Sequence, residues 1–329
     1  MRKLLMKKNN YIFFLMLSFV FIASYALALS PAGAIVYQKI NKVISKKEYP
    51  PVPVISKDAT FPIFSAQGVL AVDLPSGVSL FEKDADKALL PASTTKIVTA
   101  LVAMNSFNKD DVIEIGNIAI EGQKMGLKKG EKITVSDLLY GLLVYSANDA
   151  AEALAQNYCT PHSLGDVGQC GRNAFILAMN NFAKSLHLEN TNFTNPSGLD
   201  GVGNHIVSTA RDLIRVSTYA MKDSEFAKIV AIKEITVKSI DGKVAHRLVN
   251  LNELLGKVPG VLGVKTGWTE SARENLVTYI ERDGHKIMIA VLGSQDRFGE
   301  TKELINWIFA NYLWQEVKVP QTTPRSNQK

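Results

Sequence analysis

The chain has 329 residues, 47% hydrophobic and 21% charged, which is typical of a packed globular protein and excludes a largely disordered chain. The formal net charge of +6 is local, because residues 1–47 hold eight basic residues and no acidic one. The remainder has 29 basic against 31 acidic residues, so the composition gives no support to nucleic-acid binding.

The N-terminus has the pattern of a segment that directs a chain to a membrane. A basic start at residues 1–10 precedes nineteen uncharged, mostly apolar residues at 11–29. About 20 such residues span a bilayer, and the preceding positive charges favour the cytoplasmic side. Small residues at 26–28 and 32–34 also fit signal-peptidase sites. We therefore predict a signal peptide or, preferably, a retained anchor, with the rest exported.

The middle and end of the chain predict one α+β domain. We assign residues 30–60, which include Pro50, Pro51 and Pro53, to a linker, 61–314 to a catalytic domain and 315–329 to a polar tail. Predicted hairpins at 68–84 and 275–294 would join in one sheet. The helices are predicted from Ser93, from an N-cap at Ser136, over 149–156 and over 300–314, where the spacing of Leu304, Trp307, Ile308 and Tyr312 gives one docking face.

Cys159 and Cys170 are the only two cysteines of the chain. Outside the cytoplasm a disulfide that closes this short loop is the favoured interpretation, and it would contribute roughly 3 kcal/mol in the loop-entropy model. A metal site formed with His162 is an alternative, although a structural zinc site usually needs four protein ligands. Two unpaired buried thiols are the third possibility.

Residues 89–104, LLPASTTKIVTALVAM, hold one charged side chain, Lys96, in an otherwise uncharged stretch. In a helix, Ser93 and Lys96 would lie on one face, close enough to meet. A lysine that loses its hydration also loses part of its charge, and its neutral amine can accept a proton from a serine hydroxyl. The alternative is a lysine that extends out of the helix to solvent. Ser106 and Lys109 repeat the spacing in a polar stretch, which we interpret as chance.

Two further segments make a catalytic interpretation more specific. Ser146-Ala147-Asn148 lies at a break between apolar helices, where serine can relay a proton and asparagine can orient an acyl substrate. Capping of the second helix by Asn148 is the alternative. In GVKTGWTE (263–270), Lys265 supplies a cation, Thr266 a small hydroxyl, and Gly267 leaves room for a substrate backbone beside the strand. An edge strand with a solvated lysine is the alternative.

These motifs together resemble the penicillin-recognising serine peptidases, in which S-x-x-K, S-x-N and K-T-G line one cleft. Over roughly residues 61–312 the sequence is similar to the D-alanyl-D-alanine carboxypeptidases, the low-molecular-mass penicillin-binding proteins. The similar segments include SANDAAEALA (146–155), TNFTNPSGLD (191–200), STARDL (208–213) and KTGWTESARENLV (265–277). The resemblance implies a β-lactamase/penicillin-binding transpeptidase-like α+β fold, with an antiparallel sheet flanked by helices and an all-helical region.

The resemblance also implies catalytic roles. Ser93 would attack the carbonyl between the last two D-alanines of a peptidoglycan stem peptide, with Lys96 as general base. Ser146 and Lys265 would complete a proton path, and Asn148 would hold the substrate amide. Water would then hydrolyse the acyl-enzyme after D-alanine leaves.

Substrate binding is implied for the K-T-G strand as a whole. The backbone N–H groups of Ser93 and Trp268 would form the oxyanion hole, and Trp268 stands where such enzymes often have histidine. Lys265 and Thr266 are the first candidates for binding the terminal carboxylate, while Gly267 lines the same strand. Weaker candidates, for which we favour a solvated surface role, are Arg273 and Arg297.

The resemblance implies that the protein needs no metal and no cofactor, and that β-lactams inhibit it covalently. Many relatives carry a further β-rich domain and a C-terminal membrane helix, whereas this sequence ends about fifteen residues after its last predicted helix. We expect the N-terminal apolar segment to replace that anchor. The protein would then act at the outer face of the cytoplasmic membrane, or in the periplasm or medium if the segment is cleaved.

Two other functions fit parts of the sequence. A serine β-lactamase shares the cleft, but no E-x-x-L-N segment lies between Ser146 and Lys265, and the middle motif is S-A-N where class A enzymes have S-D-N. A membrane-anchored module that binds β-lactam or peptidoglycan without catalysis is the second alternative. It does not explain why Ser93, Lys96 and the K-T-G segment are all present.

Overall fold

The computed structural model describes residues 35, 49–160, 169–200 and 206–317. The chain divides into two units after Pro50, and only the second is described over most of its length. The apolar run at 11–29 lies outside the described residues. In the described part of the chain, no helix is both long and apolar enough to cross a membrane.

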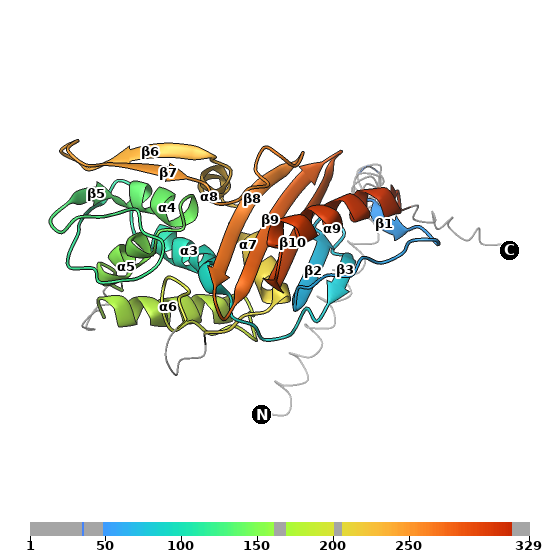
Figure 1. The fold of residues 1–329 in the computed structure, drawn as a ribbon, viewed down its shortest axis with the longest axis horizontal. Helices are drawn as coiled ribbons and strands as arrows, with labels where there is room; N and C mark the ends of the chain where they lie inside the picture. Colours follow the sequence, from blue (N-terminus) through green and yellow to red (C-terminus); the bar gives the residue numbers. More distant parts are fainter. Residues whose placement is uncertain (1–34, 36–48, 161–168, 201–205, 318–329) are drawn as a thin grey trace, which may run out of the picture. The chain divides into compact units, whose positions relative to one another are not determined.

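A five-stranded antiparallel sheet forms the centre of the second unit, with strand order β3-β2-β10-β9-β8 (Figure 1). Its strands are β2 (Gly68–Asp73), β3 (Ser79–Lys83), β8 (Val261–Thr269), β9 (Arg273–Arg282) and β10 (His285–Ser294). Both predicted hairpins are present, and they join in one sheet as expected. Strand β8, which carries the K-T-G segment, lies at the edge of this sheet, and among the described strands β9 alone pairs with it.

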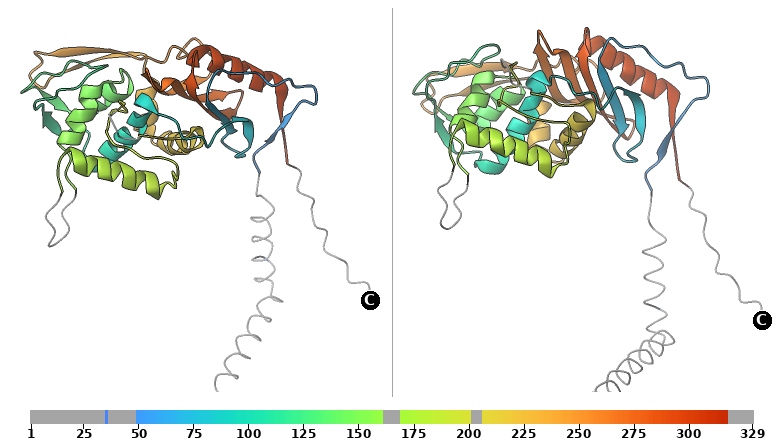
Figure 2. Two further views of the ribbon diagram at one scale, coloured as in Figure 1. Left: turned by 60° about the horizontal axis from the view of Figure 1, so that its bottom comes forward. Right: turned by 90° about the horizontal axis from the view of Figure 1, so that it is seen from below.

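Helices cover both faces of this sheet, as Figures 1 and 2 show. Helix α9 (Arg297–Asn311) packs on one face, where Leu304, Ile305 and Ile308 are fully buried and the helix contacts β9 and β10. Helix α7 (Ala210–Ala220) packs on the other face. Because both faces are buried, the central strands are almost continuously apolar.

The predicted helix at 300–314 begins earlier and ends earlier than expected. Asp296 caps its first turn by accepting from the Gly299 backbone N–H at 2.8 Å. Tyr312, which we placed on the docking face of the helix, instead begins a short strand, β11 (Tyr312–Gln315). Trp307 is half-buried, and its indole donates to the Thr60 carbonyl at 2.7 Å.

A second region contains the other helices of residues 49–317 that the structure describes, together with two short β-ribbons (Figure 2). The helices are η1 (a 3₁₀ helix, Ala92–Thr95), α3 (Lys96–Ser106), α4 (Val135–Leu143), α5 (Asn148–Gln156), α6 (Arg172–Ser185) and α8 (Ser224–Val230). The ribbons pair β4 (Val112–Glu114) with β5 (Lys132–Thr134) and β6 (Glu234–Lys238) with β7 (Ala245–Val249). The architecture confirms the predicted α+β class.

Two local predictions are wrong. The N-cap of α4 is Thr134 and not Ser136, because Thr134 has extended backbone angles and its hydroxyl accepts from the Asp137 N–H at 3.1 Å. In addition, a strand lies within the segment that we assigned to the linker. Strand β1 (Val52–Ile55) pairs with β11, and Pro53 fits there because a strand at an edge does not need every N–H.

Candidate active site

The first turn after Pro91 brings Ser93 and Lys96 together. Ser93 lies in η1 and Lys96 is the first residue of α3, so the predicted helix starts as a 3₁₀ turn. Residues three apart are eclipsed in a 3₁₀ turn, which places both side chains on the same line. The Lys96 Nζ atom is 2.8 Å from Ser93 Oγ. Ala92 has a φ of +47°, an unfavourable angle for a residue with a Cβ, directly before the serine.

Lys96 is fully buried, at 0% exposure, and so is the rest of the α3 segment from Ile97 to Ala103. The alternative of a lysine reaching solvent is therefore wrong. Burial, and secondly the charge of Lys265, hold the pKa of the Lys96 amine well below its usual value. A neutral amine at this position is consistent with a general base.

The partners of the Lys96 amine determine the direction of its lone pair. Besides Ser93, Nζ lies 2.7 Å from Asn148 Oδ1 and 2.6 Å from the Ser197 carbonyl oxygen. Both of these oxygens can only accept hydrogen bonds. A neutral amine has two N–H donors, so both are used on these acceptors, and its lone pair faces the Ser93 hydroxyl. A neutral amine in this arrangement is able to accept the Ser93 proton.

Ser197 is a site residue that our sequence reasoning missed, although its segment, TNFTNPSGLD, was noted for its resemblance. The Asn195 carboxamide oxygen accepts from the Ser197 and Gly198 N–H groups and so shapes the turn that presents the carbonyl. Gly198 has a φ of +84°, and a Cβ there would lie 1.9 Å from the Ala92 oxygen. A backbone carbonyl cannot be recognised from the type of its side chain. The Asn-Pro-Ser-Gly sequence that forms the turn is the signal that could have indicated this part of the site.

The break at 146–148 supplies two further polar groups. Ser146 has a φ of +62°, and its hydroxyl oxygen accepts from Lys265 Nζ at 2.8 Å. The interpretation of Asn148 as a cap of α5 is wrong, because Ala147 is the N-cap and no side chain caps the helix. Instead the Asn148 Nδ2 donates to the Glu121 carbonyl at 2.8 Å, while its Oδ1 accepts from Lys96. The two contacts agree on the orientation of the amide.

Strand β8 brings the K-T-G segment against the nucleophile. A Cβ at Gly267 would lie 3.0 Å from the Pro91 carbonyl and 3.2 Å from the Ser93 backbone nitrogen. The glycine therefore allows β8 to approach η1, in addition to the predicted room for a substrate. Thr266 is buried at 5% exposure, whereas Trp268 projects from the strand at 61% exposure.

Lys265 is not the solvated lysine of an ordinary edge strand, because it is 2% exposed. Its ammonium also donates to the Thr266 carbonyl at 3.0 Å. Burial, followed by the positive charge of Arg297, lowers the pKa of Lys265 to about 7.

The two arginines proposed for carboxylate binding differ in environment. Arg273 is exposed, as expected for a surface residue. Arg297 is half-buried at the start of α9, and its Nη1 donates to the Gly267 carbonyl at 2.9 Å, so the solvated interpretation is wrong for this residue. Its buried Nε has no hydrogen-bond partner among the described residues. Burial also lowers the pKa of the Arg297 guanidinium.

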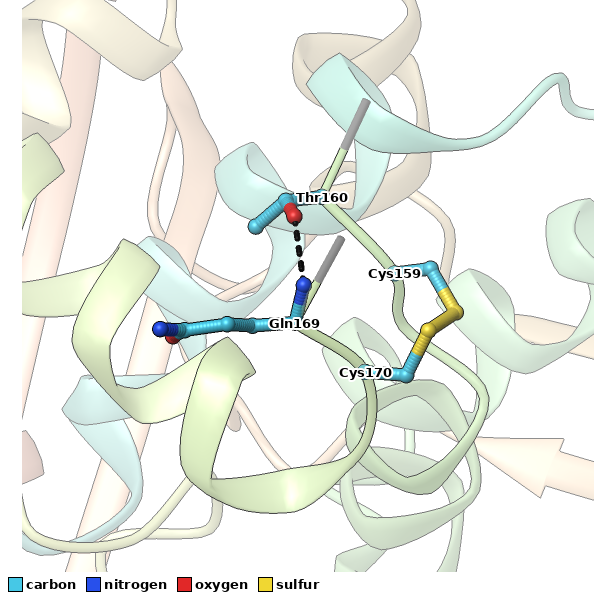
Figure 3. Close-up of a disulfide and its surroundings, with 4 residues drawn as sticks. All are labelled: Cys159, Thr160, Gln169 and Cys170. Atoms are coloured by element: carbon cyan, nitrogen blue, oxygen red, sulfur yellow. Dashed lines mark hydrogen bonds between the residues drawn. A yellow bond between two sulfur atoms is a disulfide. The ribbon is translucent and has the colours of Figure 1, made fainter. Parts of the chain in front are cut away.

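Cys159 and Cys170 form the predicted disulfide between α5 and α6 (Figure 3). The Gln169 backbone N–H donates to the Thr160 hydroxyl at 3.0 Å beside it. The bond uses both sulfur atoms that a metal site would have needed. In the described residues no other group of three or more His, Cys, Asp or Glu side chains could hold a metal ion.

A serine at a helix start, a buried lysine as its partner and a second serine–lysine pair define a serine hydrolase site that works without histidine. The chain matches the family model described as D-alanyl-D-alanine carboxypeptidase, peptidase family S11, over residues 55–296. It therefore belongs to the D-alanyl-D-alanine carboxypeptidase family and is a serine peptidase.

Individual relatives agree with this assignment. The D-alanyl-D-alanine carboxypeptidase DacB2 of Mycobacterium tuberculosis is 36% identical over 253 residues, covering 74% of this chain and 82% of that protein. The D-alanyl-D-alanine carboxypeptidase of Streptomyces sp. strain K15 is 34% identical over 267 residues, covering 76% and 89%. The crystal structure of the Streptomyces K15 DD-transpeptidase is similar with a TM-score of 0.70 at 33% identity, covering 77% of this chain and 100% of that one.

Proposed function

We propose that this protein is a serine-type D-Ala-D-Ala carboxypeptidase that removes the terminal D-alanine from peptidoglycan stem peptides through an acyl-enzyme on Ser93. The observation that carries the proposal is the buried Lys96 amine, 2.8 Å from Ser93 Oγ, with its other hydrogen-bonding capacity used on two carbonyl oxygens. That arrangement activates a hydroxyl for attack on an acyl group.

In the acylation step, Ser93 Oγ bonds to the carbonyl carbon between the two D-alanines, and its proton moves to Lys96. The backbone N–H groups of Ser93 and Trp268 stabilise the oxyanion, for which each donor is typically worth about 3 kcal/mol. The C–N bond then breaks, and the departing nitrogen takes a proton by way of the Ser146–Lys265 pair. Water hydrolyses the ester and regenerates the serine.

The terminal carboxylate of the substrate is bound at the K-T-G strand. The ammonium group of Lys265 and the hydroxyl of Thr266 are the candidate ligands on β8 itself. Arg297 adds a positive charge beside them, because it is hydrogen bonded to the carbonyl of Gly267, the next residue of the strand. Asn148 contributes indirectly in the free enzyme, since both ends of its amide already contact protein groups. Its expected contact with the substrate amide stays a prediction.

The activity is tested by incubating the full-length protein with a pentapeptide that ends in D-Ala-D-Ala and following free D-alanine by mass spectrometry. Ser93→Ala should release none, and it should lose covalent labelling by a fluorescent penicillin, because no other hydroxyl of the described residues is hydrogen bonded to Lys96. Release of D-alanine by Ser93→Ala at the wild-type rate would refute the assignment.

The same labelling experiment separates the two alternative functions. A penicillin adduct that lasts for many minutes supports the carboxypeptidase, whereas turnover within seconds supports a serine β-lactamase. Stable labelling without any D-alanine release supports a non-catalytic β-lactam-binding module. Adding an amine acceptor then shows whether the acyl-enzyme also undergoes transpeptidation.

We infer further that the protein works in the cell envelope, because its substrate is the peptidoglycan there. Residues 11–29 have the length and composition of a membrane anchor, and the basic residues before them favour a cytoplasmic start. Mass spectrometry of the N-terminus of the mature protein tests retention. An N-terminus following Ala28 or Ala34 would show a cleaved signal peptide instead.

A further inference from the structure

A network outside the three motifs connects His246 to the catalytic lysine. His246 lies on β7, on the inner side of a ribbon whose strand exposure alternates, and it is 4% exposed. Its Nδ1 is 2.9 Å from the Met125 carbonyl oxygen, and its Nε2 is 2.7 Å from Glu131 Oε1. A second carboxylate, Asp137 on α4, interacts electrostatically with the same imidazole.

The loop that His246 contacts, residues 121–131, is fixed at several backbone groups. Glu131 is 7% exposed and accepts from the Lys128 N–H at 2.9 Å, which closes the turn at the end of the loop. The Asp149 carboxylate on α5 accepts from the N–H of Met125 at 3.0 Å. Residue 125 is therefore held at its N–H by α5 and at its carbonyl by β7.

The other end of the loop orients Asn148. The Gln123 carbonyl accepts from the Asn148 backbone N–H at 2.7 Å, and the Glu121 carbonyl accepts from its Nδ2 at 2.8 Å. The Asn148 Oδ1 then accepts from Lys96 Nζ at 2.7 Å. A shift of the loop would therefore change the orientation of the Asn148 side-chain amide, and with it the hydrogen bond that orients the Lys96 amine.

We propose that His246 is a positioning residue for acylation, which holds the 121–131 loop so that Asn148 orients the Lys96 lone pair toward Ser93. The Met125 carbonyl can only accept, so Nδ1 donates to it, while Nε2 faces the Glu131 carboxylate. The inference rests on the proposed function of Ser93 and Lys96.

The test measures acylation of the full-length protein by a fluorescent penicillin under stopped-flow conditions, which separates the dissociation constant of the non-covalent complex from the acylation rate constant. His246→Leu should lower the rate constant at least tenfold and leave the dissociation constant within twofold. His246→Gln keeps one donor for the Met125 carbonyl and should recover part of the rate. This split would not arise from a general loss of stability.

Val237→Ala is the matched control, because Val237 pairs with His246 across the ribbon, is 4% exposed and does not contact the loop through a hydrogen bond. It should lower the melting temperature and leave the acylation rate constant within twofold of wild type. If His246→Leu does not fold, His246→Gln is compared with Val237→Ala, and its rate constant must be the lower of the two.

Three results would overturn the inference: a wild-type rate constant in His246→Leu, equal losses in His246→Gln and Val237→Ala, or a His246→Leu defect confined to the dissociation constant. Each leaves the proposed function standing, provided that wild-type protein is labelled at Ser93. A wild-type protein that penicillin does not label would instead refute the proposed function itself.

Discussion

Replacement of Lys96 by methionine tests the central chemistry while keeping an unbranched side chain in the buried space. In the described part of the chain, Lys96 is the residue whose side chain is hydrogen bonded to Ser93 Oγ. A positioned general base typically contributes 10²- to 10⁴-fold to a rate, which corresponds to about 3–5 kcal/mol in the transition state. We expect the acylation rate constant of Lys96→Met to fall by about that factor.

The same variant should remain folded. Asn148 Oδ1 and the Ser197 carbonyl lose their donor, and an unsatisfied buried acceptor costs about 1–3 kcal/mol. The cost of burying a polar amine disappears at the same time, so the net loss should be roughly 2 kcal/mol. Urea unfolding followed by circular dichroism measures this difference.

The chain offers a matched control in its second Ser-x-x-Lys copy. Lys109 is exposed, and Ser106 donates instead to the Val102 carbonyl at 2.7 Å, so the two do not form a catalytic pair. Lys109→Met should be labelled by fluorescent penicillin at the wild-type rate. If Lys96→Met is also labelled within tenfold of the wild-type rate, the base is another group and the reasoning from the buried amine is wrong.

Three further outcomes follow from the geometry. Gly267→Ala should lower acylation at least tenfold in a labelling assay with little change in melting temperature, because its Cβ would lie 3.0 Å from the Pro91 carbonyl and 3.2 Å from the Ser93 nitrogen, so that the strand and the nucleophile must separate by a few tenths of an ångström. The pKa of Lys265 is about 7 in the folded protein, against an ordinary value of 10.5. Between these two pH values the folded protein has released the Lys265 proton, whereas the unfolded chain still holds it. Stability relative to Lys265→Met should therefore rise with pH over this range, by at most about 1.4 kcal/mol per unit in urea unfolding. The double replacement of Cys159 and Cys170 by serine should cost roughly 3 kcal/mol of stability and leave D-alanine release unchanged.

The sequence predicts the contact between Ser93 and Lys96 well because its signal is local. Ser93 and Lys96 are three residues apart, and a helical turn of either type brings them together. The Ser197 carbonyl, by contrast, lies 101 residues from its lysine partner, and a backbone oxygen is the same in every residue. Its position follows from tertiary packing of the Asn-Pro-Ser-Gly turn on η1, which spacing alone does not encode.

Residue environments were harder to predict than residue identities. Arginine at the start of a helix usually lies on the surface, which is why we expected a solvated Arg297. In the structure its guanidinium is half-buried and donates to the Gly267 carbonyl of the K-T-G strand. His246 stands in a short ribbon between exposed residues, and its partners, Met125 and Glu131, are 121 and 115 residues away. Both contacts join elements that are distant in sequence. Local spacing in a single sequence does not show which residues of such elements face each other.

Arg297 provides a prediction in which binding and pH dependence change together. Its Nη1 donates to the Gly267 carbonyl, which fixes a positively charged guanidinium beside the K-T-G strand, where the substrate carboxylate is proposed to bind. Its positive charge is also the second cause, after burial, of the lowered pKa of Lys265. Arg297→Leu should therefore raise the KM for a D-Ala-D-Ala peptide at least tenfold and move the alkaline limb of kcat/KM to higher pH.

The direction of that pH shift follows from which form of Lys265 binds the substrate. The protonated form attracts the carboxylate, so kcat/KM should fall as pH rises through a pKa of about 7 in the wild type. Without the neighbouring guanidinium the ammonium form is less disfavoured, and the fall begins at a higher pH. Arg273→Leu is the control, because Arg273 is exposed at the start of β9, the strand that follows the K-T-G strand. This replacement should change neither the KM nor the pH dependence of kcat/KM. An increase in KM without the pH shift would mean that Arg297 binds substrate but does not influence Lys265, and a pH shift without any change in KM would exclude it from carboxylate binding.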